Sequence, residues 1–237
     1  MKVATVEKLL DLKARKEQVA LVTDLVSGAQ DLFTATHHAP ALNLSPAAAE
    51  QVALAIREDR TGELTLDGKT CFVQVHNPAP RLIIIGAVHI SQALAPMSAL
   101  AGYAVTVVDP RRAFATEDRF PGVTLSGEWP DEAMVKLAPD VRTAVVTLTH
   151  DPKLDDPALS AALKSPAFYI GALGSKKTHA ARLGRLTKAG FSESDIARIH
   201  GPAGLDIGAK SPAEIAVSVL AQLTAARRNR QSQRPTG

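Results

Sequence analysis

Two glycines, a serine and two lysines follow the end of an apolar run, and this combination suits the binding of an anion. In YIGALGSKKTHAARLGRL, Gly171 and Gly174 leave backbone amides uncovered, and Ser175, Lys176 and Lys177 then open a helix. Bare amides at a helix N-terminus, a hydroxyl and ammonium groups favour a phosphate or a similar anion. The GxxxxGK spacing of a P-loop is absent. The segment therefore predicts an anion cradle of another kind, with a plain glycine-rich turn as the alternative.

An acid and an arginine stand directly after another apolar run. Asp109 and Arg111 follow VTVV, where a dinucleotide-binding domain carries an acidic residue for a ribose hydroxyl. The turn that precedes them along the chain is GAVHIS, in which the three glycine positions of GxGxxG read Gly86, Val88 and Ser91. The second glycine of that motif lets the backbone approach a pyrophosphate. Val88 therefore weakens the prediction of an NAD-type cofactor.

Three further segments place polar residues where the same ligand would lie. His89 stands at a helix start and His150 follows TAVVTLT, while a nearby acid, Asp155 or Asp156, is expected to cap the next helix. For His89, ligand contact and a turn-lining role both remain open. GPAGLDIGAK is dense in glycine and proline, as binding loops often are. The predicted cofactor-binding residues are Gly86, His89, Asp109, Arg111, His150, Gly171, Gly174, Ser175, Lys176, Asp206 and Gly208.

From Arg81 onward, the elements that position these residues alternate between strand and helix. Such alternation predicts an α/β fold with a Rossmann-like, doubly wound parallel sheet, whose strand ends carry the ligand loops. The strands are centred on Ile84, Val107, Val146 and Tyr169, with weaker ones near Val123 and Ile199. The helices are expected at residues 90–101, 156–164, 177–189 and 212–227, the last with Ser211 as its cap, Pro212 first and Glu214 as the capping partner.

HNPAP, residues 76–80, carries two prolines before the first core strand and is the expected joint between two parts of the chain. Residues 1–78 predict a small α/β appendage, with helices at 6–16 and 47–58 and strand-like runs between and after them. Residues 79–226 are the expected Rossmann-like domain. Residues 227–237, which contain Gln, Ser, Pro and several Arg, are expected to form a disordered basic tail.

The charge and composition exclude several classes of function. The net charge is +3, but Arg227, Arg228, Arg230 and Arg234 all lie in the last eleven residues, so the body lacks the basic face of a nucleic-acid binder. No apolar run approaches the ~20 residues of a membrane helix, and a cytoplasmic location is expected. Cys71 is the one cysteine and lies in the alternating run KTCFVQV, which predicts a core residue. We expect no metal site in the chain itself.

Four segments together resemble a known family, the XdhC/CoxI accessory proteins of molybdenum enzymes. They are LIIIGAVHIS with VTVVDPRRAFATEDRFPG, VVTLTHDPKLDDPAL, YIGALGSKKTHAARLGRL and RIHGPAGLDIGAKSPAEIAVSVLA, within residues 81–226. The last two, in this order and spacing, are far more specific than a Rossmann turn. The resemblance implies a chaperone that binds molybdenum cofactor, protects it while its terminal sulfur is installed, and delivers it to a xanthine dehydrogenase-type apoenzyme.

The resemblance also implies roles and partners. Gly174, Ser175 and Lys176 would hold the cofactor's phosphate, and Asp109 and Asp206 would accept from pterin N–H groups. The expected partners are a molybdenum hydroxylase apoenzyme of the xanthine, aldehyde or carbon monoxide dehydrogenase type, a cysteine desulfurase, and a second copy in a homodimer.

The chain departs from the family pattern in two places. The family turn GAGH reads GAVH here, and residues 1–78 lack the cysteine-bearing glycine motif of longer members, so sulfur is expected from a partner. An NAD(P)-dependent oxidoreductase and a scaffolding subunit without a ligand are the alternative functions.

Overall fold

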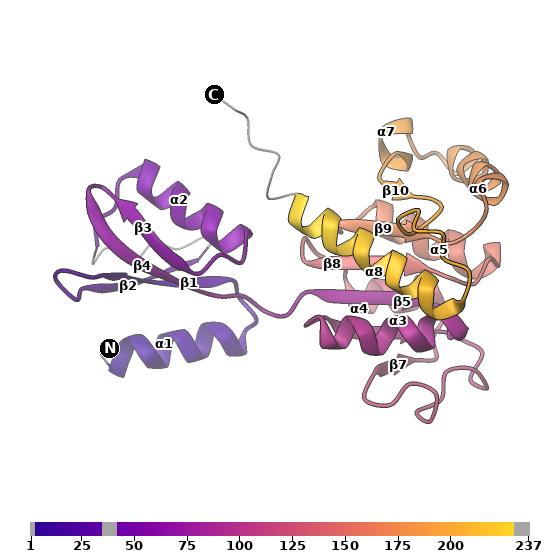
Figure 1. Cartoon of the computed structure of the whole chain (residues 1–237), viewed down its shortest axis with the longest axis horizontal. Helices are drawn as coiled ribbons and strands as arrows, with labels where there is room; N and C mark the ends of the chain where they lie inside the picture. Colours follow the sequence, from indigo (N-terminus) through magenta and orange to yellow (C-terminus); the bar gives the residue numbers. More distant parts are fainter. Residues whose placement is uncertain (1–2, 35–41, 230–237) are drawn as a thin grey trace. The chain divides into compact units, whose positions relative to one another are not determined.

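The computed structural model describes residues 3–34 and 42–229 of the chain, which divides into two compact units, Met1–Pro78 and Ala79–Gly237 (Figure 1). The division falls within the proline-containing segment HNPAP. Each unit has its own buried apolar clusters. The two units are therefore described separately.

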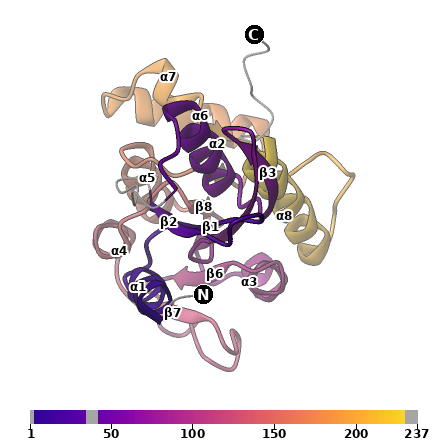
Figure 2. The ribbon, with the colours of Figure 1, turned by 90° about the vertical axis from the view of Figure 1, so that its left-hand side faces the viewer.

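The first unit is an antiparallel sheet with a helix on each side. Its sheet has the order β2-β1-β4-β3, and α1 and α2 lie on opposite faces (Figure 2). Cys71 is buried in the cluster under α2, which confirms it as a core residue. The elements are α1 (Val3–Ala14), β1 (Val19–Asp24), β2 (Gln30–Thr34), α2 (Pro46–Arg57), β3 (Gly62–Leu66) and β4 (Lys69–His76).

The second unit contains a six-stranded parallel sheet in the order β10-β9-β8-β5-β6-β7. Numbered from its own first strand, this is the 6-5-4-1-2-3 order of dinucleotide-binding domains, and the chain direction reverses between β5 and β8. The predicted Rossmann-like α/β fold is thereby confirmed. The strands are β5 (Arg81–Ile85), β6 (Ala104–Val108), β7 (Thr124–Ser126), β8 (Thr143–Thr147), β9 (Tyr169–Ala172) and β10 (Ile199–His200).

Helices cover both faces of this sheet because its central strands are apolar on both sides. Leu82 and Ile84 of β5 pack toward α3 and α8, whereas Ile83 and Ile85 pack toward α4 and α5. The helices are α3 (His89–Leu100), α4 (Pro130–Leu137), α5 (Pro152–Leu163), α6 (Lys176–Lys188), α7 (Glu193–Ile196) and α8 (Pro212–Asn229). None of the helices in the described part of the chain is long and apolar enough to cross a membrane.

Three helices differ from the sequence prediction. α4 was not predicted, although Pro130 at its first position and acids in its first turn are a start signal. α5 begins at Pro152, earlier than predicted. α8 extends through residues 227–229, which were assigned to the tail, because its apolar face continues to Leu223 and Ala226 against the core. The rest of the predicted tail, residues 230–237, lies outside the described residues.

Candidate functional site

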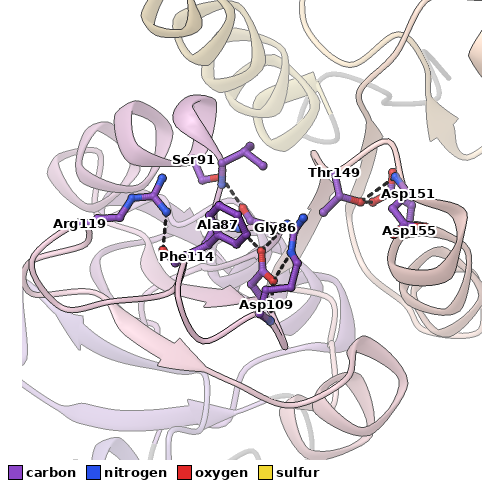
Figure 3. Close-up of polar contacts among 11 residues, drawn as sticks. Gly86, Ala87, Ser91, Asp109, Phe114, Arg119, Thr149, Asp151 and Asp155 are labelled. Atoms are coloured by element: carbon purple, nitrogen blue, oxygen red, sulfur yellow. Dashed lines mark hydrogen bonds and ion pairs between the residues drawn. The ribbon is translucent and has the colours of Figure 1, made fainter.

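The loops that carry the predicted binding residues leave the carboxyl ends of neighbouring parallel strands. β5 and β8 flank the point where the strand order reverses, and β6 and β9 lie next to them. In Figure 3, Gly86, Ala87 and Asp109 face Thr149, Asp151 and Asp155 across this point. In sheets of this type, ligands bind outside the carboxyl ends of the strands at the reversal. This edge of the sheet is therefore the candidate site.

Gly86 is the closest approach between the two sides of the reversal. Its φ is +106°, a conformation that side-chain-bearing residues rarely adopt. A Cβ at this position would lie 2.4 Å from Cγ2 of Thr149, so the space beside Gly86 is filled by that methyl group. Ser91 completes the turn, because its hydroxyl donates to the carbonyl of Gly86 and accepts from the amide of Val88 at 3.0 Å.

Asp109 joins the loops after β5 and β6 and is completely buried. Its Oδ2 accepts from the amide of Ala87 at 2.8 Å and from Nη2 of Arg111 at 2.7 Å. Its Oδ1 accepts from the amide and from Nε of Arg111, both at 2.9 Å. These four bonds use the acceptor positions of a carboxylate. The contacts thus make Asp109 the anchor of Ala87 and Arg111, and its contact with a ligand stays a prediction.

The charge of this anchor is strongly maintained. Burial by itself raises the pKa of Asp109, but the hydrogen bonds from Arg111 and Ala87 outweigh burial and hold the pKa below its ordinary value. The Asp109 bonds in turn raise the pKa of Arg111, and Asp151 adds to this effect. Because 43% of the Arg111 side chain is exposed, a fixed guanidinium remains accessible at this edge.

Phe114 and Arg119 form a platform beside Arg111 that the sequence analysis did not single out. The Arg111 guanidinium lies 4.8 Å from the centre of the Phe114 ring. Arg119 donates to the carbonyl of Phe114 at 2.6 Å and to Oε1 of Gln92, in α3, at 3.1 Å. An aromatic residue flanked by arginines after a strand end was the available signal.

The anion loop, residues 173–177, links β9 to α6. Ser175 is the N-cap of α6, and its Oγ accepts from the amide of Thr178 at 3.1 Å. Gly174 has a φ of +144°, and a Cβ there would meet Thr178 side-chain atoms at 3.1 Å. The amides of the first helical turn have no acceptor within the helix. The geometry therefore matches the predicted cradle, with Lys176 exposed at the first helical position.

A buried ion pair, Asp155 with Arg182, lies beneath these loops and was missed by the sequence analysis. The prediction that Asp155 or Asp156 caps α5 was wrong, because Asp151 is the N-cap and accepts from the amide of Lys153 at 2.9 Å. Asp155 instead points into the interior, where Thr149 donates to it at 2.6 Å. No local pattern marks such a pair, since its members come from two helices.

The other predicted residues have different surroundings. His89 is exposed at the start of α3, and His150 is exposed with a φ of +63° near Gly174. Gly171 lies inside β9 rather than after it, and a Cβ there would be 2.8 Å from the ring of Tyr169, so packing accounts for this glycine. Asp206 and Gly208 are exposed on the loop between β10 and α8. The binding roles of these residues stay predictions.

The loop between β10 and α8 is fixed by its two ends. Gly204 has a φ of +105° and its amide donates to Oε1 of Gln222 at 2.8 Å. The hydroxyl of Tyr169 donates to the same oxygen at 2.6 Å. At the other end, Glu214 accepts from the amide of Ser211, and Ser211 Oγ accepts from the amide of Glu214, which confirms the predicted capping box.

Gln222→Leu is expected to lower the free energy of unfolding by about 1–3 kcal/mol, because two buried donors lose one acceptor. Urea unfolding of the two proteins measures this difference. Gln222→Glu keeps an acceptor oxygen facing both donors and is expected to lose less. Equal losses in the two variants would show that side-chain packing, and not the shared acceptor, fixes the loop.

A metal centre needs several ligand side chains gathered around one point. Among residues 3–34 and 42–229, no three His, Cys, Asp or Glu side chains are grouped so that they could hold a metal ion. The groups gathered at the carboxyl edge are amides, hydroxyls and guanidinium groups instead. They suit an anion or a polar heterocycle.

A parallel sheet in this strand order, with a glycine turn after its first strand, defines a Rossmann-type domain, a class that binds ligands at the strand reversal. Residues 82–223, more than half of the chain, match the family model of the XdhC Rossmann domain. The chain belongs to the XdhC family.

Three curated relatives are similar to this chain. YqeB, an uncharacterized protein of Escherichia coli, is 34% identical over 67% of this chain and 29% of its own length. The molybdenum cofactor insertion chaperone PaoD of E. coli is 33% identical over 63% of this chain and 41% of its own. A Bacillus subtilis protein, named as a probable subunit of xanthine dehydrogenase, is 34% identical over 66% and 46%. The matches span less than half of each relative's length.

A solved structure shows the same fold. It is a Bacillus halodurans protein described as a xanthine dehydrogenase, with a TM-score of 0.72 and 23% identity. The likeness covers 98% of this chain and 66% of the other. Both units of the chain therefore contribute to the likeness in fold.

Proposed function

We propose that the chain binds molybdenum cofactor as cargo and assists its sulfuration and its insertion into a molybdenum hydroxylase of the xanthine dehydrogenase type. The observation that carries this proposal is the similarity to the chaperone PaoD over 63% of the chain. The fold likeness and the anion loop at the strand reversal support it. Xanthine, aldehyde and carbon monoxide dehydrogenases are the client types proposed, with a cysteine desulfurase as the source of sulfur.

The chemistry of the cargo suits the groups at this edge of the sheet. Molybdenum cofactor is a pterin that carries a phosphate and a dithiolene-bound metal. The amides of the anion loop, the Ser175 hydroxyl and Lys176 suit the phosphate. Arg111 and the exposed Phe114 ring suit the planar, polar pterin. The chain's own residues would bind and shelter the cargo, and no residue is assigned a catalytic step.

The direct test is to purify the protein from cells that make molybdenum cofactor and to assay molybdenum and the fluorescent oxidised pterin. Both near one per chain would support the carrier role. Both absent, together with failure of the apo-protein to take up released cofactor, would contradict it. A homodimer stays a prediction, which light scattering of the same sample tests.

Lys176→Ala is expected to weaken the binding of released cofactor roughly tenfold, because one charge-assisted contact to phosphate is lost. Retention of pterin fluorescence after gel filtration, measured over a range of cofactor concentrations, gives the affinity. Lys188→Ala, at the opposite end of the same helix, is the matched control and is expected to bind like the wild type. Unchanged binding by the Lys176 variant would argue against the cradle.

The strand order itself favours a second candidate, an NAD(P)-binding oxidoreductase. Against it, Val88 occupies the second glycine position, and Asp109 already accepts four hydrogen bonds from Ala87 and Arg111. A rise in the melting temperature with a nicotinamide nucleotide would support this candidate, and its absence would remove it.

A further inference from the structure

The ion pair beneath the anion loop is almost completely removed from water. Asp155 of α5 and Arg182 of α6 are each 1% exposed. Their closest charged atoms, Oδ2 and Nη2, lie 3.5 Å apart. A second ion pair joins the same two helices: Arg185 contacts Asp156 through two hydrogen bonds of 2.5 and 2.9 Å and is partly exposed. The two pairs differ in what else they touch.

Only the buried pair reaches the loops. Nη2 of Arg182 donates to the carbonyl of Leu173 at 2.8 Å, directly before Gly174 and the first amides of the anion loop. The amide of Leu173 donates to the carbonyl of Thr147 at 2.9 Å, so both polar groups of this peptide segment are held. Asp155 accepts from the Thr149 hydroxyl in the neighbouring loop.

The pair is poorly satisfied for a purely structural element. Nε and Nη1 of Arg182 and Oδ2 of Asp155 are buried and have no hydrogen-bond partner among the described residues. Burial raises the pKa of Asp155 and lowers the pKa of Arg182, as expected for charges held away from water. A buried ion pair with unsatisfied atoms adds little to stability, and apolar residues often serve a core as well. The charge at Arg182 therefore requires another explanation.

We infer that Arg182 is a positioning residue of the anion loop, which fixes the carbonyl of Leu173 and holds a buried positive charge against the loop, while Asp155 reduces that charge. The anion it favours is a phosphate or pyrophosphate group. This inference deepens the proposed function, because the group recognised would be the phosphate of the cargo. It predicts preference for a phosphorylated ligand over its dephosphorylated form.

Substitutions at the two residues are expected to act in opposite directions. Arg182→Met removes both the charge and the bond to Leu173 and is expected to weaken pyrophosphate binding roughly tenfold or more. Arg182→Lys keeps the charge without the forked donor and is expected to lie between that variant and the wild type. Asp155→Asn removes the opposing charge and is expected to tighten binding roughly threefold. A residue needed only for folding would weaken binding in every variant.

Arg185→Met is the matched control, because it removes the other ion pair between α5 and α6 without touching the loop. The measurement is an NMR titration of the full, nitrogen-15-labelled chain with inorganic pyrophosphate, followed at the amides of residues 174–177. We expect loop-specific shifts in the wild type and in the control, with affinities within about twofold of each other. Thermal unfolding of each variant verifies that it is folded.

Three results would overturn the inference: no shifts of the loop amides in the wild type, equal weakening in the Arg182 and Arg185 variants, or weaker binding in Asp155→Asn. If Arg182→Met does not fold, the opposite signs expected for Arg182→Lys and Asp155→Asn still decide the question. Pyrophosphate also separates this inference from the proposed function. A wild type that binds pyrophosphate at the loop but takes up no molybdenum cofactor would retain the positioning role and refute the carrier.

Discussion

Gly86→Ala is expected to lower the free energy of unfolding by about 2–4 kcal/mol, because it combines backbone strain with overpacking. The φ of +106° disfavours any side chain, and the new Cβ would lie 2.4 Å from Cγ2 of Thr149. Since both residues flank the strand reversal, we also expect the loops after β5 and β8 to separate. Urea unfolding measures the energy, and amide shifts of the two loops report the separation.

The double variant Gly86→Ala with Thr149→Ser tests the cause. Serine lacks the crowding methyl group but keeps the hydroxyl that donates to Asp155. We expect it to restore part of the lost stability, with the remainder due to the positive φ. A double variant whose loss equals the sum of the two single losses would show that the contact with Thr149 is not the cause.

The second large effect is expected for Asp109→Asn, which should lose about 2–3 kcal/mol at pH 7. An asparagine has one acceptor oxygen, so its NH2 group would face the Ala87 amide or the Arg111 donors that the carboxylate now accepts. Arg111→Met is the control, because it keeps both backbone bonds to Asp109 and removes a side chain that is 43% exposed. A comparable loss in the control would assign the stability to the ion pair instead.

The pH dependence of that difference has a definite sign. The folded-state pKa of Asp109 lies below its ordinary value of 3.8, so the folded chain binds the proton less readily than the unfolded chain. The contribution of Asp109 is therefore fully present above its unfolded pKa and is lost as the pH falls through the lower, folded pKa. The stability gap between wild type and Asp109→Asn is expected to narrow below about pH 4. A gap that does not change with pH would contradict a charged Asp109.

Local patterns predicted the elements that have local causes. The aliphatic run around Ile84 predicted a strand buried on both faces, and Ser211 with Glu214 predicted the start of α8. Ser175 and Gly174 predicted a turn with uncovered amides. These predictions succeeded because the interactions involved join residues close in sequence.

Residues whose partners are distant in sequence were missed or misread. Asp155 reads as a helix cap in sequence, yet its partner Arg182 lies on another helix, where only tertiary packing brings the charges together. Asp109 was correctly placed at a strand end, but its hydrogen bonds to Ala87 could not be predicted without the neighbouring loop. The Gly171 turn was misplaced because the ring of Tyr169, two residues earlier, explains the missing side chain.

The packing of α8 against α3 sets an order of events during synthesis. Leu94 of α3 and Leu223 of α8 belong to one core cluster with Ile84 of the central strand. At ~5–20 residues per second on the ribosome, Leu94 emerges on the order of ten seconds before Leu223. One apolar face of the sheet is therefore uncovered in the nascent chain, and we expect it to be a binding site for general folding chaperones until α8 closes it. A protein proposed to shelter a labile cargo thus depends on shelter while it is being made.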